Sequence, residues 1–190
     1  MKNFSDTGPG WYVYHTSVGT SNYLRLETDA AQTSESNYVW NGTAPDANLF
    51  TLGGGSSYVN DSGKNHIAYC FKRTPGLIGI GEYTGNGGAD GPYVIVDDGA
   101  SGFKPAFILL KKYSASGTRW IIVDNARDPY NPTLVELWAD GNNTESTASR
   151  PIDLVSNGFK LRASDSAYNS GDFIYLAFAE MPFAMNNRAK

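Results

Sequence analysis

The stretch Ile174-Tyr175-Leu176-Ala177-Phe178 decides the fold, because a similar stretch, Ile67-Ala68-Tyr69-Cys70-Phe71, occurs 107 residues earlier in the 190-residue sequence. Both runs are short, apolar and rich in β-branched or aromatic residues, which is the pattern of a buried β-strand. Repeats of this kind indicate that one folding unit occurs more than once in a chain. We therefore expect two related β-rich halves.

Further matches follow in the same order along the chain. Trp11-Tyr12-Val13-Tyr14 corresponds to Trp120-Ile121-Ile122-Val123, Leu24-Arg25-Leu26 to Val135-Glu136-Leu137, and Phe50-Thr51-Leu52 to Phe159-Lys160-Leu161. The offset drifts by at most four positions, from 107 to 111, as loops of different length would cause. The sequence predicts one duplicated domain, with copy one at about 10–76, a connecting segment at 77–101, copy two at 102–183 and a tail at 184–190.

The rest of the chain has the same strand pattern. Short apolar runs alternate with turn sequences such as Thr84-Gly85-Asn86-Gly87-Gly88, and almost nothing favours a helix. We expect strands at residues 10–16, 23–27, 47–52, 66–73, 78–84, 91–96, 106–113, 119–124, 134–138, 158–162 and 172–180. The expected fold class is all-β: an internally duplicated antiparallel β-sandwich, or a jelly-roll-like domain, with pseudo-two-fold symmetry.

Copy one is one strand short in this comparison. Copy two begins with an apolar strand at 102–112, about ten residues before Trp120, whereas residues 1–10 contain nothing comparable before Trp11. A missing strand leaves main-chain groups unpaired at a sheet edge. Two explanations stay open: a neighbouring subunit or partner protein adds a strand or covers the edge, or residues 77–93 supply the strand internally.

Composition excludes several classes of function. The net charge is −4, with 15 basic residues spread along the chain, so no basic field exists to hold nucleic acid. No apolar run is long enough to span a bilayer, and no apolar signal core follows the N-terminal residues. We expect a soluble, unprocessed chain with neither nucleic-acid binding nor membrane insertion.

Catalytic motifs are missing from the sequence. Neither His15 nor His66 has a carboxylate partner or a second histidine at metal-ligand spacing. The sequence has no nucleophile elbow and no dinucleotide or phosphate-binding loop. Glu35 and Glu145 hold equivalent places in the two copies, which a duplication separates rather than pairs. We expect no enzymatic activity and assign no catalytic residue.

No cofactor is expected, and Ca²⁺ is a secondary candidate only. Clustered acidic oxygens occur at Asp90 with Asp97-Asp98-Gly99, and at Asp124-Asn125 with Asp128, but neither cluster has the spacing of an EF-hand. Turn formation explains these residues equally well. The single cysteine, Cys70, is expected to be a small buried apolar residue.

Aromatic residues are the remaining candidates for binding. They make up 13% of the sequence, and exposed rings among Asn, Ser and Thr suit both protein interfaces and sugar-binding faces. The candidates for interface or glycan contact are Trp11, Trp40, Tyr38 and Trp138. Trp40 lies outside the duplicated strands and is expected to be the most exposed, unless it packs beneath a long loop.

Five stretches resemble a β-rich domain of bacteriophage tail and fibre proteins, often found after concanavalin-A-like lectin modules. The resemblance spans nearly the whole chain, and the stretches lie at 82–87, 102–111, 126–132, 154–162 and 174–183. It implies a virion component displayed on the exterior of the particle, with no family catalytic residue to carry over. Domains of this kind begin with a Gly-Phe-x-Pro strand before the first tryptophan copy, and this sequence starts after it.

Together these observations predict a bacteriophage virion structural protein, namely a tail, fibre or capsid-decoration subunit that acts through contacts with other virion proteins. A homo-oligomer, for instance a trimer, is the expected state because repeated virion proteins assemble with cyclic symmetry. The alternative is a module of a phage fibre that binds carbohydrate or a host receptor and recognises a host surface glycan through exposed aromatic rings.

Overall fold

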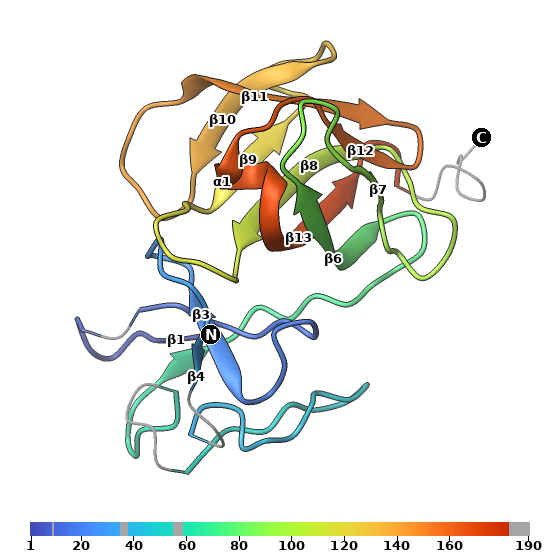
Figure 1. Ribbon diagram of the computed structural model, residues 1–190. Helices are drawn as coiled ribbons and strands as arrows, with labels where there is room; N and C mark the ends of the chain where they lie inside the picture. Colours follow the sequence, from blue (N-terminus) through green and yellow to red (C-terminus); the bar gives the residue numbers. More distant parts are fainter. Residues whose placement is uncertain (9, 35–37, 55–58, 183–190) are drawn as a thin grey trace.

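The computed structural model describes residues 1–8, 10–34, 38–54 and 59–182 (Figure 1). Within these residues the chain forms thirteen β-strands and one four-residue helix, α1 (Ser166–Asn169). All the paired strands run antiparallel to their neighbours. The all-β, antiparallel fold class predicted from the sequence is confirmed.

Eight strands form one strongly curved sheet, drawn in the upper part of Figure 1. Their order in the sheet is β6 (Ile78–Asn86), β13 (Ser170–Ala179), β8 (Pro105–Lys112), β9 (Ile121–Asp124), β10 (Thr133–Trp138), β11 (Ser146–Val155), β12 (Gly158–Leu161) and β7 (Tyr93–Ile95). The N–H of Ile80 in β6 donates to the C=O of Asp97, just beyond β7, at 2.9 Å. The two edges of the sheet therefore nearly meet, giving a barrel-like body.

The interior of this body is apolar because alternate residues of each strand point inward. Ile108, Ile121, Phe159 and Phe173 are among the buried residues of this core.

The short helix α1 is capped by the Asp165 carboxylate, which accepts the N–H of Ala167.

The first part of the chain forms a smaller sheet with much shorter strands. β1 (Lys2–Asn3) pairs with β5 (His66–Ile67), and β2 (Tyr12–Val13), β3 (Asn22–Arg25) and β4 (Thr33–Ser34) form a second group. Met1 joins the two groups, since its α-amino group donates to the Tyr12 carbonyl and its own carbonyl accepts the Tyr12 N–H, both at 2.8 Å. The order is therefore β5-β1-β2-β3-β4.

This order repeats that of β13-β8-β9-β10-β11, and the strand registers agree. Lys2 faces Ile67 as Lys111 faces Ile174, Tyr12 faces Arg25 as Ile121 faces Trp138, and Tyr23 faces Thr33 as Glu136 faces Ser146. Hydrogen bonds beyond the strands agree as well: Ser5 Oγ accepts the Asn65 N–H as Ser114 Oγ accepts the Asp172 N–H. Residues at matching places in the two copies are called counterparts below.

The structure corrects one part of the sequence alignment. Leu24 is the counterpart of Leu137, and not of Val135, because Val13 faces Leu24 and its counterpart Ile122 faces Leu137. A shift of two residues keeps every side chain on the same face of a strand, so the hydrophobic pattern alone cannot reveal it. The repeat also reaches back to Met1, upstream of the predicted start near residue 10.

The two copies have separate cores and pack against each other through a third cluster. Tyr12, Val39, Trp40 and Val59 form the core of copy one. Between the copies, Val18 and Leu24 contact Trp120 and Ile174, and Trp120 Nε1 donates to the Arg25 carbonyl at 2.8 Å. Two β layers, each with a core behind it, thus share an apolar contact.

The internal explanation for the missing strand of copy one is wrong. β6 and β7, which cover most of residues 77–93, pair with β13 and β12 of copy two. The strand predicted at 47–52 is absent from that described stretch, and the one predicted at 66–73 is reduced to β5. β1, β4 and β11 were not predicted.

Candidate functional site

The main anomaly of the surface is the segment 67–71, which continues β5 (Figure 1). All five of its residues are exposed, including Tyr69 at 64% and Phe71 at 51%, whereas none of their counterparts at 174–178 is exposed. The expected burial of Cys70 is therefore wrong. A run of apolar strand residues in solvent is uncommon in a monomeric protein and marks an interaction surface.

The number of neighbouring strands explains this exposure. β13 lies between β6 and β8, so both of its edges are paired. Among the described strands, only the short β1 pairs with this part of the chain, at His66 and Ile67. Within the described part of the chain, residues 68–71 make no main-chain hydrogen bond. The same sequence pattern is therefore a central strand in copy two and an open edge in copy one.

Aromatic side chains extend this surface. The Tyr69 ring lies 5.7 Å from the ring of Trp11, and the Phe71 ring lies 5.9 Å from that of Phe178 in β13. Lys2 Nζ lies 5.7 Å from the centroid of Trp11, as its counterpart Lys111 lies 5.9 Å from Trp120. We call Trp11, Ile67, Tyr69 and Phe71 the edge patch.

The four aromatic candidates from the sequence occupy different environments. Trp11 is partly exposed and belongs to the edge patch, and Tyr38 is 54% exposed. The expectation that Trp40 is the most exposed is wrong: it is 6% exposed, lies in the core of copy one and donates from Nε1 to the Asn22 carbonyl. Trp138 lies in copy two, so the structure does not gather the four into one site.

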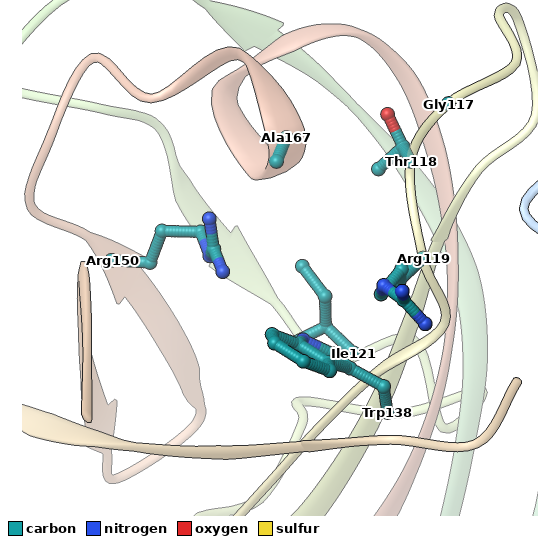
Figure 2. A pocket seen from close by; sticks show the side chains of 7 residues that line it. All are labelled: Gly117, Thr118, Arg119, Ile121, Trp138, Arg150 and Ala167. Atoms are coloured by element: carbon teal, nitrogen blue, oxygen red, sulfur yellow. The ribbon is translucent and has the colours of Figure 1, made fainter. Parts of the chain in front are cut away.

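Trp138 lines a small pocket of about 200 Å³ on the barrel-like body, shown in Figure 2. The pocket lies among seven residues: Gly117, Thr118, Arg119, Ile121, Trp138, Arg150 and Ala167. Its volume is below the range of roughly 300–1,000 Å³ that is usual for small-molecule sites.

The polar groups of this pocket are already engaged. Arg150 donates through two nitrogens to the Glu136 carboxylate and contacts Asp165 at 3.2 Å. Glu136, only 2% exposed, also accepts from Trp138 Nε1 at 2.9 Å. The neighbouring acids raise the pKa of Arg150, mainly through the hydrogen bonds that Arg150 donates to the Glu136 carboxylate. Arg119 lies over the Trp138 ring, with its guanidinium carbon 4.8 Å from the ring centroid.

The acidic loops considered for Ca²⁺ are used as turn acceptors. The Asp98 carboxylate accepts main-chain N–H groups from Gly76, Ala100 and Gly102, and Asp124 accepts those of Ala126 and Arg127. Among the described residues, no group of three or more His, Cys, Asp or Glu side chains could hold a metal ion.

Neither His15 nor His66 belongs to a group of potential metal ligands among the described residues. His15 is 8% exposed, accepts the Ser17 N–H at Nδ1 and has its pKa lowered to about 4, chiefly because burial disfavours the imidazolium. The buried Nε2 atoms of both histidines make no hydrogen bond to any described group. In the described ranges, no helix is long and apolar enough to cross a membrane.

Sequence reasoning identified Trp11 but missed the rest of the edge patch. Ile67, Tyr69 and Phe71 have strand-like spacing, which predicts burial, and their exposure depends on neighbours that copy one does not have. The signal that could have identified them was the missing strand of copy one, because its neighbour along the sheet is the segment 67–71.

Comparison with known proteins gives one family match. No curated protein and no solved structure matched the chain. A family model, described as a domain of unknown function (DUF7483), matches residues 1–182, which is almost the entire sequence. The chain therefore belongs to the DUF7483 family.

Proposed function

We propose that this protein is a structural subunit on the exterior of a bacteriophage particle, in a tail, a fibre or a capsid decoration, and that it acts through protein–protein contacts. The observation that carries the proposal is the edge patch. It combines exposed Ile67, Tyr69 and Phe71 side chains with main-chain groups that have no partner among the described residues. Both features favour contact with another polypeptide.

The virion assignment is supported by the sequence resemblance to phage tail and fibre domains. The low content of charged residues, 18%, and the abundance of aromatic residues suit a subunit that packs against others. A role in binding is also consistent with the pocket, because the charged side chains there, Glu136 and Arg150, are already paired with each other.

The glycan-binding alternative has less support. A sugar-binding face needs aromatic rings that are free to stack on the sugar beside polar groups that are free to bind it. Of the four candidates, Trp40 is buried and Trp138 already has Arg119 over its ring, while Trp11 and Tyr38 are exposed at least in part but are not gathered into one face with them. We therefore do not put this function forward.

The proposal is tested with particles of the phage whose genome encodes this chain. Gradient-purified particles are analysed by mass spectrometry and labelled on their exterior with an antibody against the protein. We expect the protein to sediment with the particles and the antibody to bind intact particles. A protein found entirely outside the particle fraction would contradict the proposal.

A matched pair of variants links the assignment to the edge patch. Tyr69→Ser removes an exposed ring from the patch, and Tyr38→Ser removes a similarly exposed ring elsewhere in copy one. We expect Tyr69→Ser to lower incorporation into particles, since it removes contact area, while Tyr38→Ser leaves it unchanged. Equal incorporation of both variants, when circular dichroism shows both to be folded, would mean that the edge patch is not the contact surface.

A further inference from the structure

The contact between the two copies joins unlike parts of their sheets. Copy one contributes residues of β3 and of the loop before it, and copy two contributes residues on its β9 and β13 side: Val18 and Leu24 pack against Trp120 and Ile174. None of these four residues packs against its own counterpart, since Leu24 corresponds to Leu137 and Trp120 to Trp11. The contact is therefore formed by two different surfaces of the same fold.

Copy one also carries the surface that copy two offers to it. Three residues of copy two in this contact have the following counterparts in copy one: Phe4 for Tyr113, Trp11 for Trp120 and Ile67 for Ile174. Phe4 is 60% exposed, Ile67 is 37% exposed and Trp11 is partly exposed. We call these three residues the receiving surface. It is an apolar sheet face whose equivalent in copy two is covered by copy one.

Copy two in turn carries the surface that copy one uses. Three residues of copy one in this contact have the following counterparts in copy two: Ile122 for Val13, Leu137 for Leu24 and Ala139 for Leu26. Ile122 and Leu137 are partly exposed, and Ala139 is exposed. We call these three residues the docking surface. Each chain thus has one surface of each kind beyond those that its own two copies use.

The receiving surface is a face of the sheet and is distinct from the sheet edge beside β1. A strand that paired along this edge would lie in the plane of the sheet and would leave the face accessible. Copy two shows this, because β8 pairs there with both β9 and β13, and copy one still packs on Trp120. The inference from this face therefore does not depend on what pairs with the edge.

We propose that the docking surface of one chain packs on the receiving surface of a second copy of this chain, as copy one packs on copy two. This inference rests on the proposed function in protein–protein contact and names the partner. Leu137 of one chain would lie against Trp11 and Ile67 of the next. Because the two surfaces are unlike, each added chain presents a new one, and the assembly is a closed ring or a filament.

A polar contact can be repeated in the same way. Trp120 Nε1 donates to the Arg25 carbonyl at 2.8 Å across the contact between the copies. The counterparts of these two residues are Trp11 and Trp138. Trp11 Nε1 would therefore donate to the Trp138 carbonyl of the second chain.

One position differs between the two contacts. Arg127 takes the place of Val18, because it follows Asp124 by three residues as Val18 follows His15, and both loops begin with an N–H bonded to that side chain. The Asp124 carboxylate holds the Arg127 guanidinium at 3.0 Å. A guanidinium beside an indole ring is favourable, so Arg127 is compatible with a place next to Trp11 of the second chain.

A pair of variants tests this arrangement. Ile67→Asp places a carboxylate on the receiving surface, and Leu137→Asp places one on the docking surface, with Ala139→Asp as a second variant there. We expect the wild-type chain to self-associate with rising concentration in sedimentation velocity. Each variant should weaken association at least about tenfold, because a buried unpaired charge is costly. Ile95→Asp, at an exposed apolar residue outside both surfaces, is the control and should associate like the wild type.

Mixing the variants distinguishes unlike from like surfaces. A mixture of Ile67→Asp and Leu137→Asp in equal amounts should form a heterodimer, since each variant keeps the surface that the other has lost. Circular dichroism checks that every variant is folded, and Ala139→Asp replaces Leu137→Asp in the mixture if the latter is not.

Three results would overturn the proposal. The first is a wild-type chain that stays monomeric up to about 100 µM. The second is equal association of Ile67→Asp and the control Ile95→Asp. The third is a mixture that stays monomeric although the wild type associates, which would indicate contact between like surfaces. If Tyr69→Ser still lowers incorporation into particles, the proposed function survives each of these results. Association of a chain that is absent from particles would support this inference and contradict the proposed function.

Discussion

Trp11 and Trp120 are structural counterparts with opposite environments. Each donates its main-chain N–H to a carboxylate, Glu27 for Trp11 and Asp140 for Trp120, and each lies beneath a lysine. Trp120 is 3% exposed because copy one covers it, whereas Trp11 is partly exposed beside Tyr69. The same local structure therefore serves the interior in one copy and the surface in the other.

The lysine above Trp120 should weaken the fold. Lys111 is fully buried, its ammonium donates to the Thr118 carbonyl, and burial lowers its pKa to about 8. The unfolded chain therefore binds this proton more tightly than the folded chain does, and stability increases as the pH rises from 8 to about 10.5. We expect Lys111→Met to raise the free energy of unfolding at pH 7 by about 1–3 kcal/mol.

Urea unfolding at pH 7 and pH 10 measures this effect. The stabilisation by Lys111→Met should shrink at the higher pH, where the wild-type lysine is neutral in the folded state. Lys112→Met, at a partly exposed neighbour on β8, serves as the control and should not stabilise the fold comparably at pH 7. A destabilised Lys111→Met variant at pH 7 would contradict the argument.

Removing one partner of the Glu136–Arg150 ion pair should destabilise the fold, whereas removing the charge of Lys111 should stabilise it. Arg150→Met leaves the Glu136 carboxylate buried with only Trp138 Nε1 as donor among the contacts described above. We expect a loss of about 3–5 kcal/mol in unfolding free energy, because an unpaired buried charge is costly. The double variant Glu136→Met with Arg150→Met should recover most of this loss. A double-mutant cycle in urea measures the coupling, and additive losses would contradict the prediction.

Buried His15 should make the fold sensitive to acid. Its pKa is about 4 when folded, against 6.5 for the free side chain, because burial outweighs the favourable effect of nearby Glu82, and Arg73 lowers it further. The unfolded state therefore gains a proton between pH 6.5 and 4 that the folded state does not, and stability falls over this range. At pH 5 the loss is about 2 kcal/mol.

Replacement of each histidine isolates this contribution. Asn can keep the acceptor for the Ser17 N–H but does not titrate, so His15→Asn should flatten the stability profile between pH 6.5 and 4. His66→Asn is the control and should retain the acid sensitivity. Unfolding midpoints measured across this range check the prediction, which fails if the His15→Asn profile matches that of the wild type.

A close approach of two main chains should make Gly158 irreplaceable. A Cβ atom at Gly158 would lie 1.9 Å from the Val94 carbonyl oxygen, where β12 pairs with β7. Gly158→Ala must therefore push these strands apart, and we expect a loss of at least about 2 kcal/mol. Gly54→Ala meets nothing within 4 Å and should change stability by less than about 0.5 kcal/mol. Thermal unfolding compares the two, and equal stabilities would contradict the geometry.

The strands that are specified by their own dense apolar runs were predicted from the sequence. β8, β9, β12 and β13 lie within about two residues of the predicted ranges, because dense apolar runs specify them. β11 was missed because Arg150 and Asp153 interrupt its pattern, and both are paired across the sheet, with Glu136 and Arg162 respectively. Partners distant in sequence cannot be read from a local pattern.

The candidate site was harder to predict because it depends on what is absent. The apolar character of Tyr69 and Phe71 predicts a buried strand, and their counterparts in β13 are indeed covered. Only the comparison of the two copies shows that copy one has fewer neighbouring strands. The same comparison would have warned that Cys70, the counterpart of buried Ala177, is exposed.

The central claim is that one fold occurs twice and that copy one has an open strand edge where copy two is closed. Amide hydrogen exchange of the isolated chain tests it most directly. We predict that Tyr69 and Phe71 exchange at rates close to those of an unstructured peptide, while their counterparts Leu176 and Phe178 exchange only through global unfolding. Slow exchange at Tyr69 and Phe71, equal to that of Leu176 and Phe178, would contradict the claim.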